Sequence, residues 1–154
     1  DNVRISLRVR GVADDGRADE LFETLGVAHV RRRKPGQMSI GEQQRVAVVR
    51  GLAHRPELLL ADEPTGNLDS LSSEVLLGQF REINRRDGQT IVMITHDMDS
   101  LFGVCDRVAV LVNKGIIVDT LEEIVKHPDP WIQEYFGDPR ALRARKASRA
   151  KVET

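Results

Sequence analysis

The feature that most constrains the fold is a short apolar run that ends in two adjacent carboxylates. Residues 58–61 are Leu-Leu-Leu-Ala, and Asp62 and Glu63 follow directly. Such a run is typical of a buried strand, and α/β sheets bind their ligands at the carboxyl ends of the strands. Two acids there are costly to bury unless a cation or a reacting water uses them. Residues 58–65 alone also fit an acidic turn after a core strand.

The segments around these acids favour the functional interpretation. Upstream, residues 38–45 have the sequence MSIGEQQR, in which Ser39 and Glu42 have the spacing of a capping box and predict that a helix begins at Ser39. Residues 66–70, GNLDS, follow the acids directly, and residues 94–97, ITHD, come one predicted helix and one predicted strand later.

In this order and spacing the four segments resemble parts of the nucleotide-binding subunits of ABC transporters. They look like the signature motif, the Walker B motif with its catalytic glutamate, the D-loop and the H-loop. The resemblance covers residues 1–125. It implies the α/β fold of a P-loop NTPase, with a parallel sheet and an ABC-type helical subdomain.

The periodicity of apolar residues predicts alternating helices and strands. A first helix buries the face that contains Leu21 and ends at Gly26. A near-continuous apolar strand at residues 90–95 predicts a sheet that is covered on both faces. The other predicted elements are a helix from Ser39 to about Ala53, a strand at 58–61, a helix at 71–86, a hairpin of 107–112 with 116–119, and a helix from Thr120 to His127.

The chain contains no phosphate-binding loop of the form G-x-x-x-x-G-K-[ST], because no Gly-Lys pair occurs among its 154 residues. It opens on Asp1, and its first residues resemble the segment that follows the Q-loop in the family. We therefore expect the Walker A motif and the Q-loop to lie upstream, so that the fold is incomplete at the N-terminus. A self-contained, degenerate protein is the alternative. Alone, this chain is expected to have no meaningful affinity for ATP.

The predicted organisation has three parts. Residues 1–56 form a helical subdomain with the signature motif, and residues 57–127 form the C-terminal half of the ATPase core. Residues 128–154 form an extension with a basic tail. In this tail Trp131 and Tyr135 lie at helical spacing, which favours a helix packed on its own domain over a docking motif. The basic residues beyond it are solvated, or contact anionic lipid or a neighbouring subunit.

The composition is that of a folded globular domain, with 40% hydrophobic and 31% charged residues. A net charge of −1 argues against a surface that binds nucleic acid, and no long heptad coiled coil of the DNA-repair ATPases is visible. The single Cys105 excludes an internal disulfide. A translation-associated ABC protein and a non-catalytic partner-binding module remain as alternatives.

The resemblance assigns roles to the acids and to one histidine. Asp62 resembles the Walker B aspartate, which holds Mg²⁺ through water, and Glu63 resembles the glutamate that deprotonates the attacking water. His96 resembles the H-loop histidine, which contacts the γ-phosphate of ATP. The other three histidines have no such context, and no role is assigned to them.

The signature motif implies a dimer. Ser39, Gly41 and Glu42 lie at a predicted helix N-terminus, which favours an anion. In the family this anion is the γ-phosphate of ATP bound to the opposite subunit, so two copies enclose two nucleotides, and Asp69 of the D-loop lines the same interface. Ile40 stands where the first signature glycine is expected. Because a β-branched residue does not readily adopt a positive φ and adds bulk, slower hydrolysis or weaker dimerisation is expected.

The choice of transporter depends on two different parts of the chain. Residues 41–47 and 61–70 look most like lipoprotein-release, macrolide-export and cell-division ATPases. Residues 96–111 and 128–136 look more like bacterial phospholipid-trafficking ATPases that work with MCE-type proteins. The expected function is an ATP-hydrolysing subunit that moves lipid or lipid-linked cargo, with phospholipid favoured. It is expected to bind transmembrane permease subunits at the cytoplasmic face of the bacterial inner membrane.

Overall fold

In a computed structural model, residues 2–13, 15–139 and 141–144 are described, and residues 1, 14, 140 and 145–154 lie outside the description. The predictions for the basic tail therefore fall mostly outside the described residues. The chain divides into two compact units, Asp1–Ile94 and Thr95–Thr154. The predicted division at residues 56 and 127 separates a helical subdomain, part of the ATPase core and a C-terminal extension. This division by function stays a prediction.

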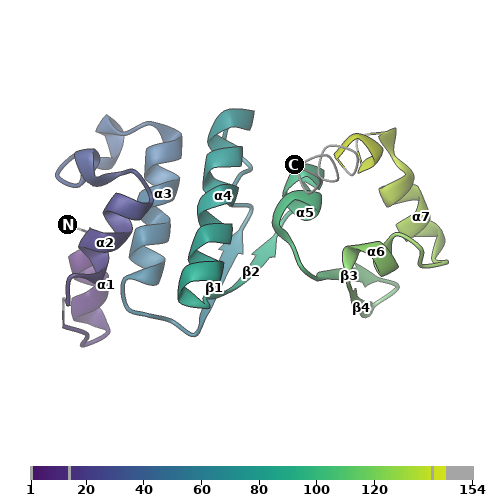
Figure 1. Cartoon of the computed structure of the whole chain (residues 1–154), viewed down its shortest axis with the longest axis horizontal. Coiled ribbons are helices and arrows are strands. Elements are labelled where there is room, and N and C mark those ends of the chain that lie inside the picture. The colour runs from purple at the N-terminus through teal and green to yellow at the C-terminus, as the bar shows by residue number, and fades with distance from the viewer. Residues whose placement is uncertain (1, 14, 140, 145–154) are drawn as a thin grey trace. The chain divides into compact units, whose positions relative to one another are not determined.

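The first unit begins with helices only, as predicted, and continues with a strand–helix–strand segment (Figure 1). Two parallel strands pair in register from Leu58↔Thr90 to Asp62↔Ile94. The elements are α1 (Asn2–Val9), α2 (Arg17–Thr24), α3 (Ile40–Leu52), β1 (Leu58–Asp62), α4 (Ser70–Asp87) and β2 (Thr90–Ile94), with short 3-10 turns at Ala28–Val30 and Pro35–Gln37.

The helix boundaries follow local capping chemistry. Ser39 caps α3 through a capping box with Glu42, as the sequence predicted. Asp69 caps α4 at its start, and Gly88 ends it in the left-handed conformation at φ +65°.

The hydrophobic core of the first unit joins α1, α2 and α3. The face of α2 predicted from its periodicity is buried, with Leu21 and Leu25 fully inaccessible to solvent. Val49 and Leu52 of α3 and Ile83 of α4 complete this core. The helical subdomain is thus held to the strand–helix–strand segment by side chains of α3 and α4.

The prediction that both faces of the sheet are covered was wrong for the residues that the structure describes. Alternate residues of both strands are exposed, including Leu60 at 71% and Ile94 at 64%, whereas Leu59 packs against the core. The apolar run predicted a strand correctly. However, the helices of this unit cover only one of its faces.

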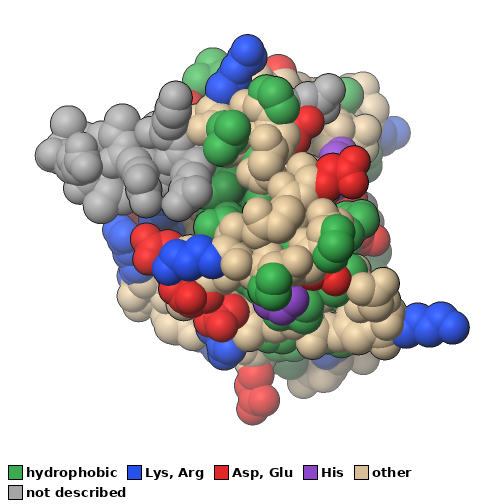
Figure 2. Space-filling view, turned by 90° about the vertical axis from the view of Figure 1, so that its right-hand side faces the viewer, with side chains coloured by type: hydrophobic (Ala, Val, Ile, Leu, Met, Phe, Trp, Pro, Cys, Tyr) green, Lys and Arg blue, Asp and Glu red, His purple; other side chains and the backbone are tan. Residues whose placement is uncertain are grey.

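The second unit contains α5 (Met98–Val104), β3 (Val108–Val112), β4 (Gly115–Asp119), α6 (Leu121–Ile124) and α7 (Pro130–Gly137). Strands β3 and β4 form the predicted antiparallel hairpin. Ile132 and Phe136 of α7 are buried in a core with Val108, Val110 and Ile124, which confirms that this helix packs on its own unit. Figure 2 shows acidic and basic side chains interspersed on one face of the molecule.

Candidate functional site

The end of β1 forms a strained turn. Asp62 is the last residue of the strand and is exposed, and Glu63 follows with φ at +43°. This left-handed conformation is uncommon for a residue with a side chain, and such strain is concentrated at functional sites. The N–H of Glu63 donates to the carbonyl oxygen of Ile94 on β2 at 2.9 Å. The turn therefore directs the Glu63 side chain differently from a continuing strand.

The residues after Glu63 form two consecutive turns. The N–H of Gly66 donates to the carbonyl oxygen of Glu63 at 3.1 Å, and that of Leu68 donates to the carbonyl oxygen of Thr65 at 3.0 Å. Thr65 is buried at 5% exposure. These turns carry the chain from the two acids to Asp69 within six residues of Glu63. The predicted Walker B and D-loop residues are therefore parts of one compact connection.

Asp69 acts as the N-cap of α4. Its carboxylate accepts hydrogen bonds from the N–H of Ser72 at 2.9 Å and from the hydroxyl of Ser72 at 2.8 Å. The hydrogen bond from the Ser72 N–H lowers the pKa of Asp69 below its ordinary value. This cap is a structural role for Asp69, and its predicted place at a dimer interface stays a prediction.

The signature segment forms the start of α3. The N–H of Glu42 donates to the Ser39 hydroxyl oxygen at 3.2 Å, and the N–H of Ser39 donates to the Glu42 carboxylate at 2.7 Å. Among the described residues, the N–H groups of Ile40 and Gly41 have no protein acceptor. The first turn of a helix offers such groups to an anion.

Gly41 of the predicted signature segment lies close to the start of α4, which follows the predicted D-loop. Gly41 is buried, and a Cβ atom placed there would lie 3.5 Å from the Ser72 hydroxyl oxygen, which donates to Asp69. This distance is ordinary van der Waals contact, so Gly41 lies one contact away from the start of α4. This packing was not predicted, because the sequence pattern indicated only a contact between Gly41 and a phosphate.

Ile40 does not have the backbone strain that the sequence suggested. It is the first residue of α3 and is absent from the described residues with positive φ. A β-branched side chain can adopt this helical conformation, so the expected conformational conflict was wrong. The predicted effect of its bulk stays a prediction, and Ile40 is 57% exposed at the start of α3.

His29 is a neighbour of the signature segment that the sequence pattern did not reveal. This residue lies in the 3-10 turn Ala28–Val30, between the fully buried Val27 and Val30. Its Nε2 atom lies 2.8 Å from the Glu42 carboxylate. The Ser39 N–H and His29 together lower the pKa of Glu42 to about 2. Nothing in the sequence marks this pair, because a lone histidine thirteen residues away carries no periodic signal.

His96 belongs to the second unit and is exposed. Asp97, which follows it, caps α5 by accepting from the N–H of Ser100 at 2.9 Å. The carbonyl oxygen of His96 accepts a hydrogen bond from the hydroxyl of Tyr135 at 3.2 Å. The structure thus gives the predicted H-loop a defined local geometry, and its contact with ATP stays a prediction.

The acids present suit a hydrated magnesium ion better than a protein metal cage. No group of three or more His, Cys, Asp or Glu side chains within the described ranges can hold a metal ion. Mg²⁺ in nucleotide sites keeps several waters and needs only one or two carboxylates besides the phosphates. An exposed Asp62 at a strand end meets that requirement.

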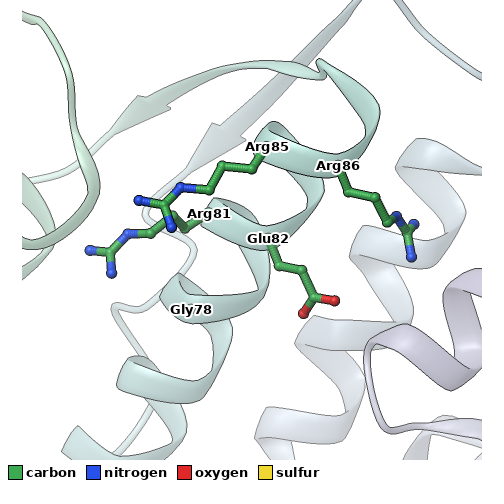
Figure 3. A pocket seen from close by; sticks show the side chains of 5 residues that line it. All are labelled: Gly78, Arg81, Glu82, Arg85 and Arg86. Carbon is green, nitrogen blue, oxygen red and sulfur yellow. The ribbon is translucent and has the colours of Figure 1, made fainter.

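A shallow groove of about 430 Å³ on α4 lies apart from these residues. It is lined by Gly78, Arg81, Glu82, Arg85 and Arg86 (Figure 3). Figure 3 shows the side chains of Arg81 and Arg85 extending to one side of the helix and those of Glu82 and Arg86 to the other. None of the predicted site residues lines this groove.

Comparisons with known proteins agree with the resemblance to ABC transporters. Residues 1–66 match the protein family described as ABC transporter. One solved structure, an inward-facing conformation of a putative metal-chelate type ABC transporter, superposes with a TM-score of 0.73 at 20% identity. It covers 81% of this chain and 53% of that chain, and at this identity it shows the fold alone.

A second solved structure is the ADP conformation of an ATP-binding cassette of an ABC transporter. It superposes with a TM-score of 0.67 at 27% identity and covers 78% of this chain and 48% of that chain. The described residues thus have the α/β fold of part of an ABC transporter ATP-binding domain.

Two relatives from bacteria show higher sequence identity than these structures and have names that state a cargo. The chain is 36% identical over 156 residues to the methionine import ATP-binding protein MetN of Bordetella avium, covering 99% of this chain and 42% of the relative. It is 43% identical over 122 residues to the protein of the same name from Rhizobium etli, covering 77% of this chain and 34% of the relative. The chain therefore spans less than half the length of these relatives. Their names give no support to the predicted lipid cargo or MCE-type partner.

Proposed function

We propose that this chain forms the signature and Walker B part of an ATP-hydrolysing subunit of a bacterial ABC importer, with methionine or a similar small solute as cargo. The observation that carries this proposal is the strained turn at the end of β1, where Asp62 and Glu63 precede the D-loop connection. The proposed cargo class is supported by the similarity to the methionine import protein of Bordetella avium, which aligns with 99% of the chain.

Asp62 is the residue that would hold Mg²⁺, through water, at the carboxyl end of β1. Its exposure allows hydrated contact without the penalty of burying a charge. When bound, the ion neutralises charge on the phosphates of ATP. The pairing of β1 with β2 along its whole length fixes the position of the Asp62 backbone, and hence of its carboxylate.

Glu63 acts as the general base. It orients the attacking water and accepts its proton while the bond between the β- and γ-phosphates breaks. The left-handed backbone at Glu63 supports this role, because it turns the side chain out of the alternation of the strand. Phosphoryl transfer needs mainly positioning and charge stabilisation, and a rigid turn supplies positioning.

Ser39 and Gly41 bind the γ-phosphate of ATP held by a second copy of the subunit, and Glu42 supports them. The unpaired N–H groups at the start of α3 and the positive end of the helix dipole suit an anion. Gly41 lies close to Ser72, whose hydroxyl donates to Asp69, which supports a common interface for both segments.

His96 contacts the γ-phosphate of ATP. The subunit binds transmembrane permease subunits and lies at the cytoplasmic face of the inner membrane. No helix within the described parts of the chain is long and apolar enough to cross a membrane.

Lipid transport is the weaker candidate for the cargo. It depends on residues 128–136, which resemble the tail of phospholipid-trafficking ATPases. The Bordetella avium relative aligns over nearly the whole chain, and its name describes methionine import. These tail residues therefore do not separate the two cargo classes.

The catalytic roles are tested in a chimera in which a phosphate-binding loop region from an ABC transporter relative precedes this chain (the chimera). Glu63→Gln should lower kcat for ATP hydrolysis by about 10²- to 10⁴-fold, the range for loss of a general base, while ATP binding persists. Glu57→Gln, an exposed acid before β1, is the matched control and should leave kcat unchanged. Parental turnover in Glu63→Gln contradicts the role of Glu63.

The metal role is tested separately with Asp62→Asn. Removing this charge should weaken Mg²⁺-dependent ATP binding, whereas binding measured in EDTA should change little. Equal Mg²⁺ dependence in the variant and its parent contradicts the role of Asp62.

The cargo is tested by complementation. A bacterium without its own methionine import ATPase should regain uptake of labelled methionine when it makes the chimera, and the Glu63→Gln chimera should not restore it. An active chimera that restores no uptake overturns the cargo assignment and leaves the ATPase assignment standing.

A further inference from the structure

Helix α7 is connected to the segment of the predicted H-loop by one long-range hydrogen bond. The hydroxyl of Tyr135 donates to the carbonyl oxygen of His96 at 3.2 Å, across 39 residues of sequence. The bond involves the backbone carbonyl group of His96 and not its imidazole ring.

The Tyr135 ring is itself held between aromatic neighbours. It stacks on Trp131 with the ring centres 4.9 Å apart and the planes within 11°. It also meets Phe136 edge to face at 5.2 Å, and Phe136 contacts Phe102 of α5 in the same manner at 6.3 Å. Because Phe136 is buried, these contacts restrict the movement of the Tyr135 hydroxyl.

The chain on the C-terminal side of His96 is fixed by short-range bonds. The N–H of Asp97 donates to the hydroxyl oxygen of Thr95 at 3.0 Å. The Asp97 carboxylate accepts from both the N–H and the hydroxyl of Ser100, which is fully buried. The Tyr135 hydroxyl therefore adds, to a turn that is already held locally, a contact from a distant element of the same unit.

We infer that Tyr135 is a positioning residue for His96, and that α7 thereby sets the geometry of the H-loop. This inference rests on the proposed function, in which His96 contacts the γ-phosphate. Rotation of the His96 peptide would move the imidazole, and the Tyr135 bond opposes that rotation. Helix α7 thus affects ATP hydrolysis without touching the nucleotide.

The direct test uses the 154-residue chain. Tyr135→Phe removes one hydroxyl and keeps the aromatic contacts, so the fold should persist. The carbonyl ¹³C resonance of His96 should shift in this variant and stay unchanged in Glu134→Gln, an exposed neighbour on α7. An unchanged His96 resonance in Tyr135→Phe overturns the inference.

The functional test uses the chimera. Tyr135→Phe should lower kcat about 2- to 10-fold, the effect of losing one neutral hydrogen bond, with KM for ATP unchanged. In a His96→Ala background the same substitution should have no further effect, because Tyr135 acts through His96. A merely structural role would lower turnover in both backgrounds.

The outcomes separate the inference from the function on which it rests. If His96→Ala leaves turnover unchanged, the role of His96 in the proposed function fails, and the inference fails with it. If His96→Ala lowers turnover while Tyr135→Phe has no effect, or has the same effect in both backgrounds, only the inference is overturned.

Discussion

His29 contacts Glu42 of the signature segment at 2.8 Å from a turn that is anchored on both sides by fully buried valines. Glu42 in turn accepts the N–H of Ser39, so the histidine extends the capping box into a three-residue network. The core of the helical subdomain thereby reaches the start of α3, where the proposed phosphate contact lies.

Replacing His29 should loosen this network. In His29→Ala, exchange of the Ser39 amide hydrogen should become about 2- to 5-fold faster, the range for loss of an exposed polar pair. His29→Gln should retain much of the protection, because its amide nitrogen can replace Nε2. Arg32→Ala, an exposed neighbour, is the control. Equal exchange in the parent and in His29→Ala would show that the contact contributes nothing to the cap.

The low pKa of Glu42 predicts how stability depends on pH. Hydrogen bonds from Ser39 and His29 lower the pKa of Glu42 from 4.5 to about 2, so the folded state favours the charged carboxylate. The resulting stabilisation is complete above the unfolded pKa and is lost as pH falls from about 4.5 towards about 2.

This dependence can be measured by urea denaturation of the parent and Glu42→Gln at several pH values. The parent should be more stable at about pH 7, and the difference should shrink as pH is lowered from about 4 to about 2. A difference that is constant over this range would contradict the assignment of the shift to Glu42.

Two glycines of the α4 segment should respond to alanine in opposite ways. Gly88 ends the helix at φ +65°, so Gly88→Ala should lower the free energy of unfolding by about 1 kcal/mol. Gly78 lies inside the helix, and no atom other than those of adjacent residues and the nearby helix backbone lies within 4 Å of the place that an alanine methyl group would take. Gly78→Ala should therefore raise the free energy of unfolding by about 0.5–1 kcal/mol. Thermal or urea denaturation of both variants tests the pair, and a change of the same sign in both contradicts the assigned conformations.

Substitutions at Ile40 test whether its bulk slows the proposed reaction. In the chimera, Ile40→Gly should raise kcat for ATP hydrolysis or strengthen ATP-driven dimerisation. Ile40→Ala is the informative control, because it removes bulk and keeps a good helix former at the first position of α3. Similar increases in both variants assign the effect to bulk, whereas no increase in either variant counts against the prediction.

Much of the local structure followed from the sequence because short-range chemistry determines it. The capping box of Ser39 and Glu42 predicted the start of α3, and the hairpin around residues 113–114 was found as predicted. The apolar run before Asp62 predicted β1 and its pairing in a parallel sheet. These patterns involve residues two to four positions apart, so the local sequence alone leaves few alternative secondary structures.

Other features depend on contacts between distant residues. The approach of Gly41 to Ser72, and the bond of Tyr135 to His96, have no periodic or local signal. The exposed face of β1 also differs from the prediction, because an apolar strand does not specify how many layers cover it.

The sequence by itself determined which elements form and where the two acids of β1 lie, since capping and periodicity are local properties. Only the tertiary structure decided that His29 contacts Glu42 at the start of α3, that Glu63 adopts a left-handed turn, and that Tyr135 contacts the backbone of His96. These arrangements arise when separate elements pack together, and packing selects among many distant pairs that the sequence leaves open.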